Sequence, residues 1–127
     1  MAATNNADLP VMVYDWNDKA IREIAENIWH AQHAGWPEVL TYVPRPGTEK
    51  RFIRRESLRG IPRIQSRDEY PFASTLENEG SVWIGHAPAE QQNAQGTLIH
   101  RFYSRHGAYE KGTAFKFRVR VVNYPVP

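Results

Sequence analysis

Residues 113–124, TAFKFRVRVVNY, contain the clearest periodic pattern in the chain. Apolar side chains at 115, 117, 119 and 121 alternate with Lys116, Arg118 and Arg120. A period of two residues is that of a β-strand, whose successive side chains point to opposite faces. The stretch therefore predicts a strand with one buried face.

Shorter patterns on the N-terminal side predict further elements. We expect strands at 11–16 (VMVYDW), 38–43 (EVLTYV) and 81–86 (SVWIGH). A helix is expected from Asn17, with Asp15 or Asn17 as its cap, and it should stop at Gly35 and Pro37.

Two more helices are predicted, a short one at 54–60 and a longer one at 87–107. Gly96 is a weak point in the longer helix and could separate a loop at 88–95 from a helix at 96–105. The order of elements predicts an α+β fold with a short mixed or antiparallel sheet and a long N-terminal helix. We expect one domain over residues 1–127.

Composition narrows the class of protein. With 41% hydrophobic residues, the chain can build a packed core. It has no cysteine, no apolar run of membrane-spanning length and no signal-peptide pattern at its N-terminus. Motifs of serine hydrolases, P-loop NTPases, zincins and Rossmann dehydrogenases are absent from the sequence.

Positive charge is concentrated in residues 50–67. This segment holds seven basic side chains against Glu56, and six of the seven are arginine. The planar guanidinium group binds phosphate oxygens in bidentate fashion. The run is either a solvated surface or a polyanion-binding surface, and its position next to a candidate site favours the second interpretation.

That candidate site is SRDEYPFAST, residues 66–75. The residue before a proline is pushed towards extended geometry, so Tyr70 and Phe72 should point into the core around Pro71. The acids Asp68 and Glu69 would then be held at a rigid, partly buried position. Two adjacent carboxylates need a compensating cation, either a divalent metal or Arg67; the structural alternative is a capping acid beside a proline kink.

Polar residues at 90–96 (EQQNAQG) supply carboxylate and amide oxygens, the ligands preferred by hard cations such as Mg²⁺. A polar helix start would explain the same pattern. The histidines His86 and His100 flank this segment and could act as a general base or steady a leaving group, although each alone is more often an ordinary surface residue.

Taken together, RRESLRGIP (54–62), RDEYPFAST (67–75), NAQG (93–96) and the closing strand at 112–121 are similar to motifs of the NucA/NucB family of bacterial deoxyribonucleases. The resemblance runs in order from about residue 25 to 121. It implies metal-dependent, sequence-nonspecific cleavage of DNA. The strand, polar turn and helix also resemble the site of ββα-metal nucleases.

The resemblance implies roles for named residues. Asp68 and Glu69 would be the active-site acids and ligands, Asn93 a further ligand for Mg²⁺ or Mn²⁺, and Arg67 a contact to the scissile phosphate. The expected DNA-backbone contacts are Arg51, Arg54, Arg55, Arg59 and Arg63. Supporting roles are expected for Ser57, Gln95, His86 and His100.

Departures from the family suggest a biological setting. Secreted members carry cysteines where this chain has Leu40 and Thr75, so the pair is replaced together. This favours a toxin tip of a bacterial secreted effector, of the Rhs or a related polymorphic type. Such a domain would be delivered into the cytoplasm of a competing cell and neutralised in the producer by an immunity protein. An RNase or mixed nuclease, and a non-catalytic nucleic-acid-binding or interaction module, remain the alternatives.

Overall fold

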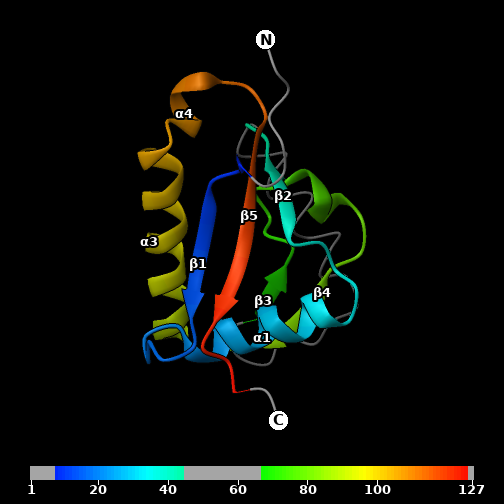
Figure 1. Cartoon of the computed structure of the whole chain (residues 1–127), viewed down its shortest axis with the longest axis vertical. Coiled ribbons are helices and arrows are strands. Elements are labelled where there is room, and N and C mark those ends of the chain that lie inside the picture. The colour runs from blue at the N-terminus through cyan, green and yellow to red at the C-terminus, as the bar shows by residue number, and fades with distance from the viewer. Residues whose placement is uncertain (1–7, 45–66, 126–127) are drawn as a thin grey trace.

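The alternating stretch forms the central strand of the main sheet. The computed structural model describes residues 8–44 and 67–125. The strand β5, Phe115–Val122, lies in the middle of the main sheet (Figure 1). β1, Val11–Asp15, pairs with β5 in parallel, and β2, Val39–Tyr42, pairs with it on the other side in antiparallel orientation. Phe117 and Val119 are fully buried, whereas Lys116 and Arg120 are exposed, which confirms the predicted strand and its buried face.

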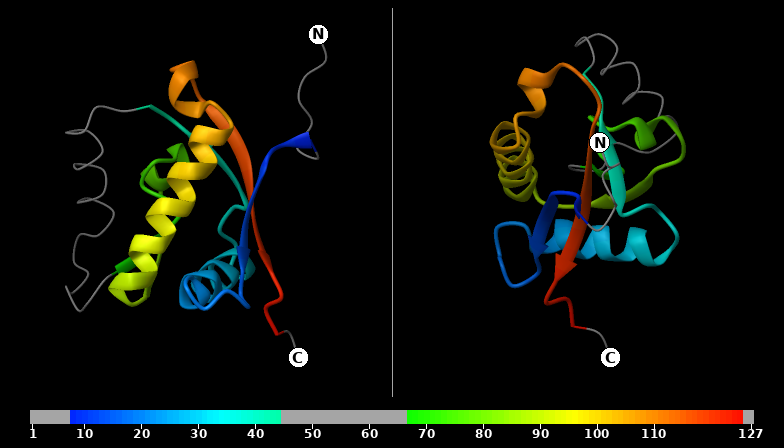
Figure 2. Two further views of the ribbon diagram at one scale, coloured as in Figure 1. Left: turned by 90° about the vertical axis from the view of Figure 1, so that its left-hand side faces the viewer. Right: turned by 45° about the horizontal axis from the view of Figure 1, so that its top comes forward.

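One face of this three-stranded sheet carries the rest of the described elements. α1, Arg22–His33, and α3, Ala89–Arg105, lie on this face together with a hairpin-like pair, β3 (Arg67–Tyr70) and β4 (Trp83–His86) (Figure 2, left). Two short helices, η2 (Leu76–Glu79) and α4 (Ala108–Lys111), complete the described structure. The result confirms the predicted α+β class with a short mixed sheet.

The core lies between the main sheet and the helices α1 and α3. Its fully buried side chains include Met12 and Tyr14 from β1, Ile24 and Ile28 from α1, and Phe117 from β5. Burying a large apolar side chain contributes roughly 1.5–3 kcal/mol. The spacing of four between the two isoleucines gives α1 the apolar stripe that faces this sheet.

The first helix begins later than predicted. Instead of starting at Asn17, α1 starts at Arg22, because residues 16–21 form turns. The Asp15 carboxylate accepts a hydrogen bond from the Asn17 backbone N–H at 2.9 Å, and Asp18 accepts one from Ala20 at 3.0 Å. These side-chain-to-backbone bonds stabilise turns in competition with a helix.

The N-terminus of α1 is capped from another helix. Ile21, at the N-cap position, makes no side-chain cap. The Gln91 side chain of α3 instead accepts hydrogen bonds from the backbone N–H groups of Glu23, at 2.8 Å, and Ile24, at 3.4 Å. The cap therefore also fixes α3 against α1.

The second long helix is continuous. α3 passes through Gly96 without interruption, so the alternative of a loop at 88–95 is wrong. Tertiary contacts hold its first turns in place, because Gln91 caps α1 and the Gln95 side chain donates to the Tyr14 hydroxyl at 3.1 Å. The predicted strands at 11–16, 38–43 and 81–86 are confirmed.

Some predictions fall where the structure gives no description. The predicted helix at 54–60 lies within residues 45–66, outside the described ranges. Within the described ranges, no helix has the length and apolar character needed to cross a membrane.

Replacing Gln91 tests the shared cap. We expect Gln91→Ala to lower the free energy of unfolding by about 1 kcal/mol, the typical cost of losing a helix N-cap. Urea denaturation measures it, with Asn93→Ala as the control because Asn93 is exposed on the same helix. Equal losses in both variants would show that the cap contributes nothing beyond helix propensity.

Candidate active site

A pocket of about 280 Å³ lies between β3 and α3. β3 contributes Arg67, Asp68 and Glu69, and α3 contributes Gln92 and Gln95. The elements β3, η2, β4 and α3 follow one another along the chain. The structure thus brings the two acids predicted from RDEYPFAST to the polar segment predicted as a source of amide oxygens.

The aromatic residues after the acids anchor β3. Tyr70 and Phe72 are both buried, as predicted. The Tyr70 hydroxyl donates a 2.6 Å hydrogen bond to the Pro37 carbonyl and accepts one from the Gln32 side chain at 3.1 Å. β3 is also paired with β4, with Asp68 opposite Gly85. These contacts fix the backbone that carries the acids.

Asp68 is held from α1 by a residue that sequence analysis missed. The Asn27 Nδ2 donates to Asp68 Oδ2 at 3.1 Å and to the His86 carbonyl at 3.2 Å. Gly85 lies against the Asn27 side chain, and a Cβ at Gly85 would lie 2.5 Å from Asn27 Cγ. The absence of a side chain at Gly85 therefore makes room for the donor. Asn27 is 41 residues from Asp68, and no local motif connects the two.

Burial changes the acidity of Asp68. The residue is only 4% exposed, and this burial raises the pKa of its carboxyl group to about 7, with a smaller contribution from the negative charge of Glu69. The hydrogen bond from Asn27 acts in the opposite direction and lowers the pKa. A group whose pKa lies near neutral pH can take up and release a proton under physiological conditions, which suits a general base.

The α3 side of the pocket is lined by amides. Gln95 is buried and donates to Tyr14. The terminal nitrogen of Gln92 is buried and has no hydrogen-bond partner among residues 8–44 and 67–125. A buried amide without a partner is costly, so Gln92 is a candidate to contact a bound group.

Other predicted site residues lie elsewhere. Asn93 is exposed on α3 and does not belong to the pocket lining. His86 is exposed, and its backbone carbonyl, rather than its ring, takes part by accepting from Asn27. His100 is exposed and contacts Tyr109, with Nδ1 3.1 Å from the hydroxyl.

Six of the predicted residues lie within 45–66, outside the described ranges. They are Arg51, Arg54, Arg55, Arg59, Arg63 and Ser57. Their roles in DNA binding and in support of the site stay predictions.

The donor set of the pocket suits a hard cation. Two carboxylates and two carboxamides offer oxygen atoms, and Mg²⁺ is commonly bound by one or two carboxylates while keeping several waters. The described part of the chain contains no cluster of three or more histidine, aspartate or glutamate side chains that could hold a metal. The residues therefore fit a partly hydrated Mg²⁺ or Mn²⁺ better than a closed zinc site.

Comparison with known proteins identifies one similarity. The sequence profile of the family described as Deoxyribonuclease NucA/NucB matches residues 44–118, which is more than half of the chain. The matched segment contains Asp68, Glu69 and Gln92, whereas Asn27 and Tyr14 precede it. No curated protein matches the chain.

The buried acid predicts a pH-dependent gain in stability for Asp68→Asn. The folded-state pKa of Asp68, about 7, lies above the ordinary value of 3.8. Between these two pH values the folded protein keeps the proton on Asp68, whereas the unfolded chain has released it. Stability of the native protein should fall as pH rises from about 4 to 7. Asp68→Asn has no carboxyl group to titrate, so its free energy of unfolding should not fall in this way. The difference in free energy of unfolding between the variant and the native protein should grow to at most about 4 kcal/mol at pH 8.

Thermal unfolding in EDTA at pH 4, 6 and 8 measures this difference. Glu90→Gln is the control, because Glu90 is an exposed acid on α3. If the difference between Asp68→Asn and the native protein were the same at all three pH values, Asp68 would titrate like an exposed carboxylate.

Proposed function

This chain belongs to the NucA/NucB deoxyribonuclease family and is a nuclease, and we propose that it is a metal-dependent, sequence-nonspecific endonuclease that hydrolyses DNA phosphodiester bonds. The observation that carries the proposal is the buried Asp68, whose pKa is raised to about 7 beside Glu69 in the pocket between β3 and α3. Both acids lie within the matched segment.

Asp68 is proposed as the general base. Its raised pKa lets it accept the proton of the attacking water at neutral pH, and Asn27 restricts the orientation of its carboxylate by binding Oδ2. Because Asn27 also binds the His86 carbonyl, the carboxylate is tied to β4 as well as to α1. The water oxygen bonds to phosphorus while the bond from phosphorus to the leaving oxygen breaks. Asp68 holds the proton of the attacking water, and the leaving oxygen takes a proton from solvent.

Glu69 and the amide oxygen of Gln92 are proposed to hold Mg²⁺ or Mn²⁺, with Gln95 adjacent to them. When bound, such a cation supplies a Lewis acid for the phosphate and lowers the pKa of a coordinated water. The proposal gives Gln92 the ligand role that the family resemblance implies for Asn93. What supports it is that Gln92 borders the pocket, whereas Asn93 is exposed.

Arginines are proposed to bind the substrate. Arg67 borders the pocket, which supports a proposed contact to an oxygen of the scissile phosphate through charge-assisted hydrogen bonds. The basic run at 50–63 would follow the DNA backbone away from the site. This contribution should weaken as salt concentration rises, because binding to phosphates releases counterions.

Burial of Asp68 favours an enzyme over a non-catalytic binding module. A carboxylate whose pKa is raised by burial destabilises the folded state at neutral pH, and its negative charge repels phosphate. A binding module would gain stability and affinity by replacing it. A catalytic role explains the presence of the residue at such a cost.

The biological role is proposed to be that of an antibacterial toxin domain, secreted or delivered from the producing bacterium into the cytoplasm of a target cell. Support comes from the absence of cysteine, since Leu40 and Thr75 occupy the positions of the paired cysteines in secreted family members and both are fully buried. An immunity protein would protect the producer.

Expression in a bacterial cytoplasm should therefore be lethal for the native sequence and harmless for Asp68→Asn.

Plasmid cleavage tests the proposed reaction. Purified native protein with Mg²⁺ or Mn²⁺ should nick and then linearise supercoiled plasmid, and EDTA should stop the reaction. Asp68→Asn should lower the rate by about 10²–10⁴-fold, the usual contribution of a general base. Cleavage by Asp68→Asn at the native rate would remove Asp68 from the mechanism, and cleavage of RNA alone would replace the DNase assignment by an RNase.

A comparison of Gln92→Ala with Asn93→Ala locates the α3 ligand. We expect Gln92→Ala to raise the Mg²⁺ concentration needed for half-maximal cleavage by at least about tenfold, as for loss of a residue that supports a metal site. Asn93→Ala should leave this concentration unchanged, because its side chain is exposed outside the pocket lining. The reverse result would assign the ligand to Asn93.

A further inference from the structure

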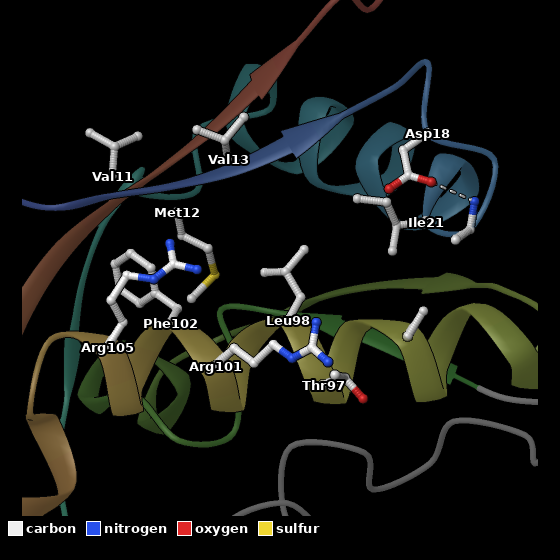
Figure 3. A pocket seen from close by; sticks show the side chains of 12 residues that line it. Val11, Met12, Val13, Asp18, Ile21, Thr97, Leu98, Arg101, Phe102 and Arg105 are labelled. Carbon is white, nitrogen blue, oxygen red and sulfur yellow. Dashed lines mark hydrogen bonds between the residues drawn. The ribbon is translucent and has the colours of Figure 1, made fainter.

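A second groove lies on the other side of α3. It has a volume of about 580 Å³ and is bounded by β1, the turns that precede α1, and α3 (Figure 3). Its floor is apolar, with Met12, Ile21, Leu98 and Phe102 among the lining residues. No residue of this groove lines the pocket that holds Asp68, so the two are separate surfaces of the molecule.

The groove follows an open edge of the main sheet. β1 pairs only with β5 among the described strands. Arg118 N–H donates to the Pro10 carbonyl and Trp16 N–H donates to the Val122 carbonyl, so even-numbered residues of β1 point their backbone groups at β5. In a strand these groups alternate in direction, so those of Val11, Val13 and Asp15 point away from β5.

An open edge of this kind can accept another strand. Val11 and Val13 also border the groove. Figure 3 shows their side chains on the side of β1 that faces away from α3, and the Val13 side chain is 47% exposed. An exposed strand edge with apolar side chains is a template for pairing with an extended segment of another chain.

Two arginines give the groove its charge. Arg101 and Arg105 lie one turn apart on α3, and both are exposed. Figure 3 shows their side chains rising from α3 on the side that faces β1. Neither forms an ion pair within residues 8–44 and 67–125. Asp18 lies at the opposite end of the groove and accepts a hydrogen bond from Ala20.

We propose that the β1 edge and this groove bind an extended, acidic segment of another protein. The backbone of that segment pairs with Val11 and Val13, its apolar side chains cover Leu98, and its carboxylates meet Arg101 and Arg105. The proposal is independent of the nuclease assignment, because none of these residues belongs to the catalytic pocket.

Two other occupants fit the surface less well. Nucleic acid would use the arginines, but the apolar floor offers nothing to a phosphate backbone. A second copy of the chain could pair β1 with β1 about a two-fold axis. That arrangement would bring the α3 helices of both copies to the same junction, where Arg101 and Arg105 would face like charges.

Selection from a displayed library of ten-residue peptides tests the proposal. The purified native protein is the bait, with free duplex DNA present as competitor. We expect the enriched peptides to carry aspartate or glutamate at alternate positions and to slow amide hydrogen exchange at Val11 and Val13. Failure to enrich acidic peptides, or protection confined to other segments, would overturn the proposal.

Charge reversal provides the second measurement. The double substitution Arg101→Glu with Arg105→Glu should weaken the affinity for the enriched peptides by at least about tenfold, because attraction between opposite charges becomes repulsion between like charges. Lys111→Glu with Lys116→Glu is the matched control, since it makes the same change in net charge at two exposed residues of α4 and β5 outside the groove. Plasmid cleavage by the double variant should stay at the native rate, which separates this test from that of the nuclease assignment.

Three results of the charge reversal would contradict the proposal. Equal weakening by the control Lys111→Glu with Lys116→Glu would reduce the effect to net charge. Loss of DNA binding by the double variant would assign the groove to nucleic acid. Concentration-dependent dimers of the native protein in analytical ultracentrifugation, altered by the double variant, would assign it to a second copy.

Discussion

Burial of the Asp68 carboxylate between β3 and α1 is the constraint on which the site depends. A carboxylate taken out of water needs hydrogen-bond partners or it stays protonated. Here one donor, Asn27, partly compensates the burial, and the pKa still rises to about 7. The fold thus maintains an acid poised between its two protonation states. The small residue Gly85, opposite Asp68 on β4, makes this arrangement possible because any side chain there would occupy the space of Asn27.

The segment matched to the family does not build this environment alone. α1, which precedes the matched residues, supplies Asn27 to Asp68 and Gln32 to the Tyr70 hydroxyl and the Val119 carbonyl. β1 supplies Tyr14, which accepts from Gln95 of α3. Gln91 of α3 returns a contact by capping α1. The N-terminal elements therefore position both the acid and the amides of the pocket, and their loss would affect the site as well as the core.

Local patterns predicted the elements, and long-range contacts decided the details of the site. The alternation around Phe117 predicted β5, and Pro71 between two aromatics predicted the buried anchor at Tyr70, because each depends on neighbouring residues alone. Asn27 could not be found this way, since its role arises only when α1 packs against β3. For the same reason, local sequence does not show which of the neighbours Gln92 and Asn93 borders the pocket. Only the rotation of α3 against β3 decides this. α1 starts later than its local sequence predicts, because a cap from Gln91, far along the chain, replaces the local one.

The most direct test of this account is a carbon-13 NMR titration of the Asp68 carboxyl group, with and without Mg²⁺. Without the cation, the account predicts a pKa near 7, because burial disfavours the ionised form. Addition of Mg²⁺ should lower this pKa, because a cation bound at Glu69 and Gln92 favours the negative charge nearby. A pKa close to 3.8 that does not respond to Mg²⁺ would contradict both the poised acid and the cation beside it.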